Sequence, residues 1–253
     1  MKALLLAAGY ATRLYPLTLD KPKPLLSVGK RPIIDYIIEK IKKIKAIDEI
    51  FVVTNHKFYK HFKIWARQNK ISHQRLIVID DATTSNDDRL GSVGDIDFVI
   101  ENQRVKDDLL VIGADNIFDA ELSDFIKFSV LKKDSNSAGL YDLTDKKLAS
   151  NYGVVCIDKD NKVTDFQEKP HQPKSTLIST CIYYFPLVKL NLFKKYMNTY
   201  TCGIDQAGSK DAAGNYIKWL KETDSVYGYV LSGKWYDIGD MESYKEADNY
   251  FKK

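Results

Sequence analysis

Hydrophobic and polar positions follow two different rhythms along this chain. Through the first half, short apolar runs alternate with stretches of helical periodicity, and the runs lie at 2–9, 49–55, 75–80 and 108–118. This alternation predicts βαβ units, which build a largely parallel sheet. After Ser137 the pattern changes to closely spaced extended segments at 138–143, 152–158, 162–169 and 176–185. We therefore expect an α/β fold with a mixed central sheet and a small antiparallel insertion.

The remaining elements are predicted in the same way. Helices are expected at 32–46, 57–68, 121–133, 187–196 and 212–222, with a strand at 226–232 and a last helix after residue 239. The polar, glycine-bearing piece at 81–97 predicts a long functional loop. With 253 residues and 44% hydrophobic content, the chain should form a single domain over 1–253, with halves at 1–135 and 136–253.

Several predicted strands end in small or polar residues that are suitable for binding a ligand. Gly9, Asn55, Asp80 and Asp115 lie at or near the ends of the apolar runs. Ligands of open α/β sheets bind beyond the carboxyl ends of the strands. These residues should therefore lie along one edge of the sheet, where we expect the functional site.

The charge balance argues against some classes of partner. The chain has 38 basic and 34 acidic side chains, and the net charge of +4 is spread along it. This distribution disfavours nucleic acid or an anionic membrane surface as a partner. The isoleucines at 34, 37, 38, 41 and 44 share one helical face. In the lysine-rich stretch at 39–49 the lysines are therefore expected to point mainly toward water, namely Lys40, Lys42, Lys43 and Lys45.

The cysteines and the N-terminus bear on the compartment. The three cysteines form no CxxC pair, and an odd number suits a reducing environment. Residues 1–11 imitate a signal peptide, but their apolar part is short and is followed directly by Thr12 and Arg13. No stretch reaches the roughly 18 apolar residues that a membrane span requires. We expect a cytoplasmic protein with no membrane partner.

The turn after the first strand is the first candidate for chemistry. Ala7, Ala8 and Gly9 are small enough for backbone N–H groups to approach an anion, which would make a phosphate cradle. The plainer interpretation is a tight strand-to-helix turn. Neither the GxGxxG nor the Walker fingerprint is present.

Two basic residues follow this turn. Arg13 precedes an extended segment in which Pro22 and Pro24 hold the backbone beside Lys23 away from helix. Such a segment suits a phosphate chain, with a planar guanidinium on one group and a point charge on another. Each residue taken singly would be a solvated surface charge.

Several motifs recur in order along almost the whole chain. They read LAAGYATRL at 6–14 with PKPLL at 22–26, GSVG at 91–94, IGADN at 112–116, YGVV at 152–155 with FQEKP at 166–170, and WYDIG at 235–239. Together they resemble the sugar-1-phosphate nucleotidyltransferases, a family that includes glucose-1-phosphate thymidylyltransferases. The resemblance implies a Rossmann-like three-layer α/β/α fold in which the antiparallel insertion binds the sugar.

The resemblance also implies a reaction. In this family a phosphate oxygen of a sugar 1-phosphate attacks the α-phosphorus of a nucleoside triphosphate, pyrophosphate leaves, and an NDP-sugar forms. Arg13 would hold the leaving pyrophosphate and Lys23 would bridge the phosphates near the α-phosphorus, as the catalytic residues. Because both reactants are anionic, the protein must neutralise and align them more than act as acid or base.

Further positions bind the two substrates by resemblance. The nucleotide, taken as dTTP, UTP or CTP, would contact Leu6, Ala8, Gly9, Thr12, Arg13, Lys23 and Gly91. The sugar 1-phosphate would contact Gly153, Glu168, Lys169 and Thr180, with Lys169 on the phosphate and Glu168 on sugar hydroxyls. Without the resemblance, Glu168 and Lys169 would read as a cross-strand charge pattern on a hairpin.

The same resemblance implies a metal site. Asp115 and Asp237 would be its ligands, and they follow strands that are far apart in sequence. Hard oxygen ligands together with phosphate oxygens suit Mg²⁺. The alternative for each aspartate is a helix cap or a surface carboxylate.

Three positions depart from the family pattern. Ala11, Ala114 and Cys181 stand where the family usually has glycine, and each adds a Cβ where backbone and ligand should be close. Cys181 is expected to face the sugar pocket and to reshape it. We interpret it as a packing residue rather than a thiol nucleophile, because no activating histidine or acid is near in sequence.

These departures leave two alternatives open. One is a cytidylyltransferase for a non-sugar acceptor such as phosphocholine, and the other is a non-catalytic nucleotide-sugar-binding protein. The chain ends one helix after WYDIG, so we expect the short catalytic form without a β-helix. Sequence leaves the base, the sugar and homo-oligomer formation open.

The weaker candidates are interpreted structurally. His56 and His61 lack the spacing of a helical zinc site and are expected on a helix face. Asp95–Asp97 and Asp158–Asp160 imitate DxD motifs, and the second is expected in a hairpin turn. The stretch 205–220 resembles a segment near the sugar site, but no role is assigned to its residues.

Overall fold

A computed structural model describes residues 1–69, 71, 73–201 and 213–252. The chain divides into two compact units. Unit 1 consists of Met1–Leu90, Ile112–Leu122 and Gly233–Lys253, and unit 2 consists of Gly91–Val111 and Ser123–Ser232. The expected halves at 1–135 and 136–253 are continuous stretches, whereas these units interleave along the sequence. A single catalytic domain over 1–253 stays a prediction.

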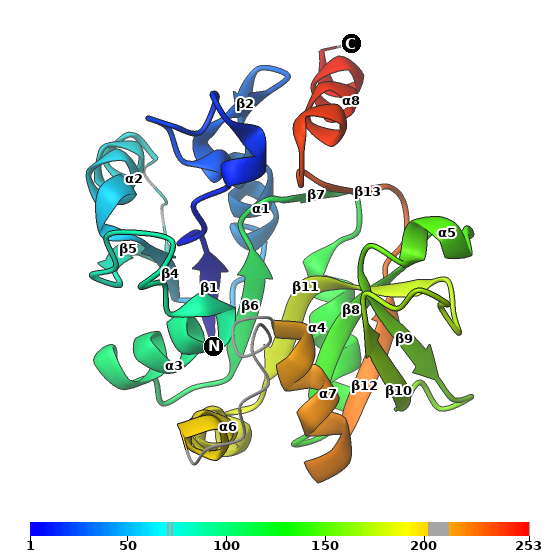
Figure 1. The fold of residues 1–253 in the computed structure, drawn as a ribbon. Helices are drawn as coiled ribbons and strands as arrows, with labels where there is room; N and C mark the ends of the chain where they lie inside the picture. The colour runs from blue at the N-terminus through cyan, green and yellow to red at the C-terminus, as the bar shows by residue number, and fades with distance from the viewer. Residues whose placement is uncertain (70, 72, 202–212, 253) are drawn as a thin grey trace. The chain divides into compact units, whose positions relative to one another are not determined.

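Unit 1 is built on a parallel sheet (Figure 1). Strand β1 (Lys2–Leu6) pairs with β4 (Glu49–Thr54), and β4 pairs with β5 (Arg75–Asp80). On the other side of β1, the Ala114 N–H just after β6 (Leu109–Gly113) donates to the Leu6 carbonyl at 3.0 Å. The strands are almost uniformly apolar because both faces of the sheet are covered.

The carboxyl ends of these strands share one edge, as predicted. Leu6 lies opposite Val53, and Thr54 lies opposite Asp80, so the chain leaves each strand at the same level. The Asn55 side chain donates to the Ala8 carbonyl at 2.8 Å and accepts from the Phe58 N–H at 3.1 Å. It thereby joins the turn after β1 to the start of α2 (His56–Gln68).

The helices of unit 1 follow their apolar stripes. Helix α1 (Ile33–Ile41) buries all of its isoleucines, and α2 buries Phe58, Phe62 and Trp65. His56 and His61 both lie on α2, as expected. The unit is completed by α8 (Met241–Phe251) and by two small antiparallel sheets, β2 (Ser27–Val28) with β3 (Arg31–Pro32) and β7 (Asn116–Phe118) with β13 (Trp235–Asp237).

The prediction that Lys40 points toward water is wrong. Its side chain is only 15% exposed, and Nζ donates to the Asp119 carbonyl at 2.8 Å. The reason is that α1 packs against β7, so the last turn of the helix meets the chain just beyond that strand. Lys43, with 62% of its side chain exposed, does face water.

Unit 2 contains the expected antiparallel insertion (Figure 1). Strands β8 (Asn136–Asp142) and β11 (Leu177–Phe185) pair antiparallel, as do β9 (Gly153–Ile157) and β10 (Val163–Glu168). Strand β12 (Val226–Val230) runs parallel to β8, which makes the sheet mixed. The helices of this unit are α3 (Gly91–Asn102), most of α4 (Leu122–Leu131), α5 (Lys146–Ala149), α6 (Asn191–Thr201) and α7 (Ala213–Thr223).

The predicted loop at 81–97 is only partly correct. The chain is irregular to Leu90, but α3 begins at Gly91, so Asp95 and Asp97 are helical. The glycines and aspartates of this segment imitate a turn, whereas burial of Val93, Ile96 and Val99 stabilises a helix. The other DxD candidate does form the expected turn, because the Asp158 side chain accepts from the Asp160 and Lys162 N–H groups.

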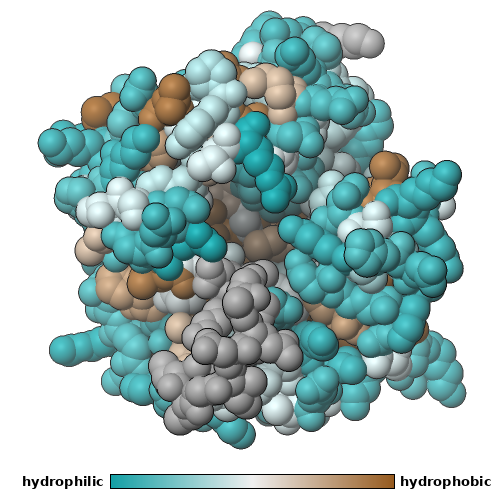
Figure 2. Space-filling view, viewed as in Figure 1, coloured by the Kyte–Doolittle hydropathy of each residue, from teal (hydrophilic) through white to brown (hydrophobic). Residues whose placement is uncertain are grey.

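Within the ranges that the structure describes, no helix is both long enough and apolar enough to cross a bilayer. On the face shown in Figure 2, hydrophilic residues predominate and hydrophobic residues form small separate patches. Scattered apolar residues of this kind are normal on protein surfaces.

Candidate active site

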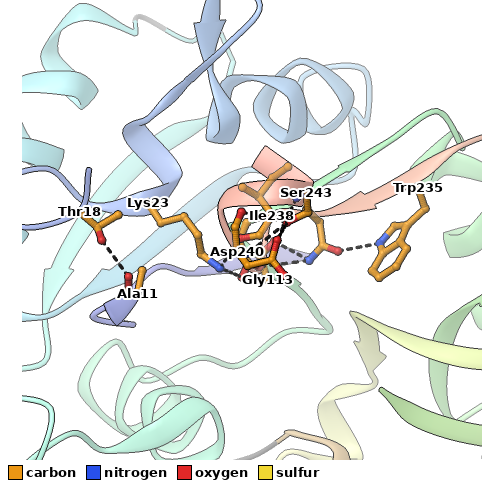
Figure 3. Close-up of polar contacts among 10 residues, drawn as sticks. Ala11, Thr18, Lys23, Gly113, Trp235, Ile238, Asp240 and Ser243 are labelled. Carbon is orange, nitrogen blue, oxygen red and sulfur yellow. Dashed lines mark hydrogen bonds and ion pairs between the residues drawn. The ribbon is translucent and has the colours of Figure 1, made fainter. Parts of the chain in front are cut away.

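The turn after β1 is held open by contacts of its own. Ala7 and Ala8 are buried, whereas a β-carbon on Gly9 would meet nothing within 4 Å. The Ala11 carbonyl accepts from the Thr18 hydroxyl at 2.8 Å (Figure 3) and from the Leu14 N–H at 3.0 Å. These bonds fold the chain back while leaving space beside Gly9, as a phosphate-binding turn requires.

Ala11 and Cys181, two of the three positions where the resemblance led us to expect glycine, have a backbone conformation that favours glycine. Ala11 has φ 48° and Cys181 has φ 59°, which is the left-handed region that side chains disfavour. Ala114 is not among the residues of positive φ. Two of the three positions therefore carry a conformational cost, and the third adds only a methyl group.

Lys23 lies at the centre of the polar contacts in unit 1. It begins a short 3-10 helix (Lys23–Leu25), with Pro22 just before the helix and Pro24 within it. The prediction that the two prolines hold the backbone beside Lys23 away from helix is therefore wrong, because the fixed φ of proline also suits the first turn of a helix. Its Nζ donates to Asp115 Oδ2 at 2.6 Å and to the Ile238 carbonyl at 2.9 Å (Figure 3). Burial would lower the pKa of this ammonium, but Asp115 and Asp237 outweigh it and raise the pKa above its ordinary value.

Asp115 and Asp237 are brought together by the small sheet of β7 and β13. Asp237 pairs with Asn116 across this sheet, and the Ile238 N–H donates to the Asp115 carbonyl at 3.2 Å. The predicted apolar run at 108–118 thus breaks into β6 and β7, with Asp115 at the break. The break is held by Asn116, which donates to the Gly113 carbonyl and accepts from the Trp235 indole at 2.7 Å (Figure 3).

The two carboxylates form an electrostatically unfavourable pair. Burial and the Asp115 charge raise the pKa of Asp237 to about 6, although Lys23 and Arg13 act in the opposite direction. A divalent cation would relieve this repulsion, and carboxylate oxygens are suitable ligands for Mg²⁺. No group of three His, Cys, Asp or Glu side chains that could hold a metal occurs in the described ranges. The donor set therefore fits an ion that takes its other ligands from phosphate and water.

Four candidate residues of unit 1, namely Arg13, Lys23, Asp115 and Asp237, lie close in sequence to a residue of one buried apolar cluster. Leu14 follows Arg13, Leu26 follows the Lys23 segment, Ile117 lies just after Asp115, and Ile238 follows Asp237. These four apolar side chains pack in one cluster and are at most 6% exposed. Hydrophobic packing thus sets the positions of polar groups that come from four stretches of sequence. Arg13 and Thr12 themselves are exposed.

The remaining predicted residues lie in unit 2. Gly91, with φ 74°, begins α3, and Gly153 lies opposite Glu168 in the pairing of β9 with β10. Lys169 is exposed with φ 43°. The Thr180 hydroxyl is buried and donates to the Gly139 carbonyl at 2.8 Å, so it is engaged within the unit. The substrate-binding roles of these residues stay predictions.

Some contributors were missed from sequence. The Ile238 carbonyl, which accepts from Lys23, is a backbone group and has no residue-type signal. The Asn116–Trp235 hydrogen bond joins two predicted motifs, but neither motif by itself indicates the pairing. Residues 205–212 and Cys202 lie outside the described residues.

Comparison with known proteins identifies the family to which the chain belongs. Residues 2–253 match the family described as nucleotidyl transferase. The chain belongs to the nucleotidyl transferase family. Members of this family generally depend on a divalent metal, which agrees with the chemistry of the Asp115–Asp237 pair.

Individual relatives of this nucleotidyl transferase point in the same direction. The bifunctional protein GlmU of Methanocaldococcus jannaschii is 30% identical over 99% of this chain and 54% of the relative. A glucose-1-phosphate adenylyltransferase of Fervidobacterium nodosum is 29% identical over 97% of this chain and 60% of the relative. The chain thus spans little more than half the length of these curated relatives.

A solved structure confirms the fold. A protein assigned as glucose-1-phosphate thymidylyltransferase from Bacillus anthracis superposes with a TM-score of 0.78 at 23% identity, covering 100% of this chain and 95% of the other. The predicted α/β fold with a mixed central sheet is therefore correct, and so is the family to which the sequence motifs pointed.

Proposed function

We propose that this nucleotidyl transferase moves a nucleotidyl group from a nucleoside triphosphate to a sugar 1-phosphate, with release of pyrophosphate and formation of an NDP-sugar. The observation that carries the proposal is the meeting of Lys23, Asp115 and Asp237 beside the open turn after β1. A binding protein would have no need of a largely buried lysine paired with one of two neighbouring aspartates that repel each other.

The residues of this chain act by aligning and neutralising charge. A phosphate oxygen of the acceptor forms a bond to the α-phosphorus, and the bond from that phosphorus to the bridging oxygen of pyrophosphate breaks. Lys23, already held by Asp115 and the Ile238 carbonyl, would present a fixed positive charge to the phosphate chain. Exposed Arg13 is available for the leaving pyrophosphate.

Mg²⁺ is the cofactor that we propose for this site. Asp115 and Asp237 would hold it, and when bound it would neutralise charge on the phosphate oxygens. Lys169 and Glu168 of unit 2 would contact the acceptor, as the family resemblance implies. A cytoplasmic location follows from the sequence argument and stays a prediction.

The decisive experiment is pyrophosphate release by the purified protein with Mg²⁺. The four ribonucleoside triphosphates and dTTP are crossed against a panel of sugar 1-phosphates plus phosphocholine. Release that depends on one sugar 1-phosphate is expected, and it would name both substrates together. Release with phosphocholine alone would move the protein to the other acceptor class, and nucleotide binding without release would favour the non-catalytic alternative.

A matched pair of variants ties the activity to the site. Lys23→Ala should lower kcat by about 10²- to 10³-fold, because it removes a preorganised charge that stabilises the transition state. Lys21→Ala, which removes an exposed lysine two residues away, should leave kcat unchanged. An effect of Lys23→Ala on KM alone would mean that Lys23 binds substrate and transition state equally.

A further inference from the structure

The Glu168 carboxylate of unit 2 lies between two glycines from different elements. On one side is Gly153 of β9, where a β-carbon would lie 3.3 Å from Glu168 Oε2. On the other side is Gly214 of α7, where a β-carbon would lie only 2.3 Å from the same oxygen. A heavy-atom approach of 2.3 Å is far inside van der Waals contact, which for carbon begins at about 3.5 Å. Any residue other than glycine at position 214 would therefore displace the carboxylate.

Packing, rather than hydrogen bonding, holds this carboxylate. Phe166, two residues earlier on β10, is 2% exposed, and its ring lies against the same two glycines. Among the residues that the structure describes, none forms a hydrogen bond or an ion pair with the Glu168 side chain. Burial raises the pKa of Glu168, and nearby Lys169 opposes the shift. The carboxylate oxygens thus keep lone pairs for donors that come from a ligand.

Gly214 has no conformational reason to be glycine. It is the second residue of α7, and it is not among the described glycines with positive φ, which are Gly29, Gly91 and Gly233. Within a helix, glycine is less favourable than alanine and than every other residue except proline. What glycine supplies at this position is space, which Glu168 Oε2 fills most closely and the Phe166 ring also reaches, with Cζ at 2.9 Å from the position of a β-carbon.

We propose that Gly214 is a positioning residue of the acceptor site, which acts by leaving room for the Glu168 carboxylate beside the first turn of α7. The inference rests on the proposed function, since Glu168 is there the acceptor of hydrogen bonds from the sugar hydroxyls. It assigns a role to a residue of the 205–220 stretch, for which the sequence alone indicates none. Gly153 chiefly makes room for the Phe166 ring, since a β-carbon there would lie 2.6 Å from Phe166 Cζ and 3.3 Å from Glu168 Oε2.

The test is the kinetics of Gly214→Ala in the full chain. The variant should raise KM for the sugar 1-phosphate by roughly ten- to hundredfold, the range expected when a hydrogen bond to a charged group is lost. KM for the nucleotide should stay the same, and Tm should fall only slightly, because the helix preference of alanine offsets the small shift of the Phe166 ring that the new β-carbon requires. Lys218→Ala, an exposed position on the same helix, should change neither KM. A raised acceptor KM accompanied by a large fall in Tm would overturn the proposal in favour of a packing defect.

A double variant tests whether the effect of Gly214→Ala on the acceptor KM is transmitted through Glu168 or through other neighbours of Gly214. In a Glu168→Ala background the change Gly214→Ala should have no further effect on the acceptor KM, because the displaced group is gone. A persisting effect would show that Gly214 acts through Phe166 or the helix, and it would overturn the proposal.

A measurement that does not depend on enzyme activity tests the positioning role of Gly214 separately from the proposed function. Carbon-13 NMR of the Glu168 carboxyl group should show its pKa moving toward the ordinary value in Gly214→Ala, because the carboxylate is pushed out of its buried position. A shift in a protein that transfers no nucleotidyl group would support the positioning role while the proposed reaction fails. An unchanged titration would overturn the positioning role whatever the activity.

Discussion

The backbone at Cys181 has a conformation that a residue with a β-carbon rarely adopts. Cys181 lies in β11 where the pairing with β8 shifts register between Ser179 and Tyr183, and its φ is 59°. A residue with a β-carbon pays about 1–2 kcal/mol in this left-handed region. From sequence the replacement of glycine looks like a change in pocket shape, whereas the structure shows that backbone strain is also present.

We predict that Cys181→Gly raises the free energy of unfolding by roughly 0.5–1 kcal/mol. Relief of the left-handed strain exceeds the extra chain entropy that glycine gives to the unfolded state. The matched control is Cys156→Gly, at a position of β9 whose φ is not positive, and it should destabilise the protein. Urea unfolding monitored by circular dichroism measures both, and equal losses of stability would contradict the strain at Cys181.

For Lys23 and Asp115, the sequence predicts the chemical type of each residue but not their contact. Their chemical types were predictable, because phosphate needs cations and a metal needs carboxylates. Their direct contact at 2.6 Å was not predictable, since 92 positions separate them in sequence. The Ile238 carbonyl that completes the lysine's surroundings lies beyond any reasoning from side-chain type.

At the scale of elements, α8 is defined by its first turn. The Asp240 side chain accepts from the Ser243 N–H at 2.9 Å, and the Ser243 hydroxyl accepts from the Asp240 N–H at 3.1 Å. This reciprocal capping box satisfies two N–H groups that the helix leaves without partners. The N-cap residue Asp240 lies three positions after Asp237, so the cap also fixes the chain where it leaves the candidate site.

We predict that Asp240→Ala lowers the free energy of unfolding by about 0.5–2 kcal/mol, the usual cost of losing an N-cap. Glu246→Ala, exposed in the same helix, should change it by less than about 0.5 kcal/mol. The Ser243 N–H lowers the pKa of Asp240 below 3.8, so the cap contributes fully above about pH 4 and is lost as acid protonates it. Denaturant unfolding at pH 7 and pH 3 should therefore show a smaller difference in acid, and a pH-independent difference would contradict the cap.

Element prediction failed where local composition and burial disagree. The segment from Gly91 looks like a loop because of its glycines and aspartates, yet it forms α3 with Val93, Ile96 and Val99 buried. The apolar run at 108–118 reads as one strand but breaks at Asp115. In both places the tertiary contacts outweigh weak local preferences.

At the scale of the whole molecule, the candidate residues divide between the two units. The positions proposed for the triphosphate and metal lie in unit 1, except Gly91, and those proposed for the acceptor lie in unit 2. Each unit has its own buried core. A ligand that contacts one set of residues should stabilise mainly the unit that carries them.

We predict that hydrogen exchange will resolve the two ligands. Nucleoside triphosphate with Mg²⁺ should protect amides at 6–14 and 22–26, whereas the sugar 1-phosphate should protect amides at 153–155 and 166–169. A non-substrate polyanion such as inorganic sulfate serves as the control for charge alone. Protection of unit 2 by nucleotide alone, with none at 6–14, would contradict the proposed division of substrates.

The sequence by itself determined the fold class, the family and most of the elements, because apolar periodicity and short motifs are local properties that folding preserves. It also indicated which strand ends would share an edge, since parallel pairing follows from βαβ order. Only the tertiary structure decided that Lys23 pairs with Asp115, that α3 replaces part of a loop, and that Gly214 makes room for Glu168. These outcomes depend on contacts between residues far apart in sequence, whose distances are set by the packed core rather than by neighbouring residues.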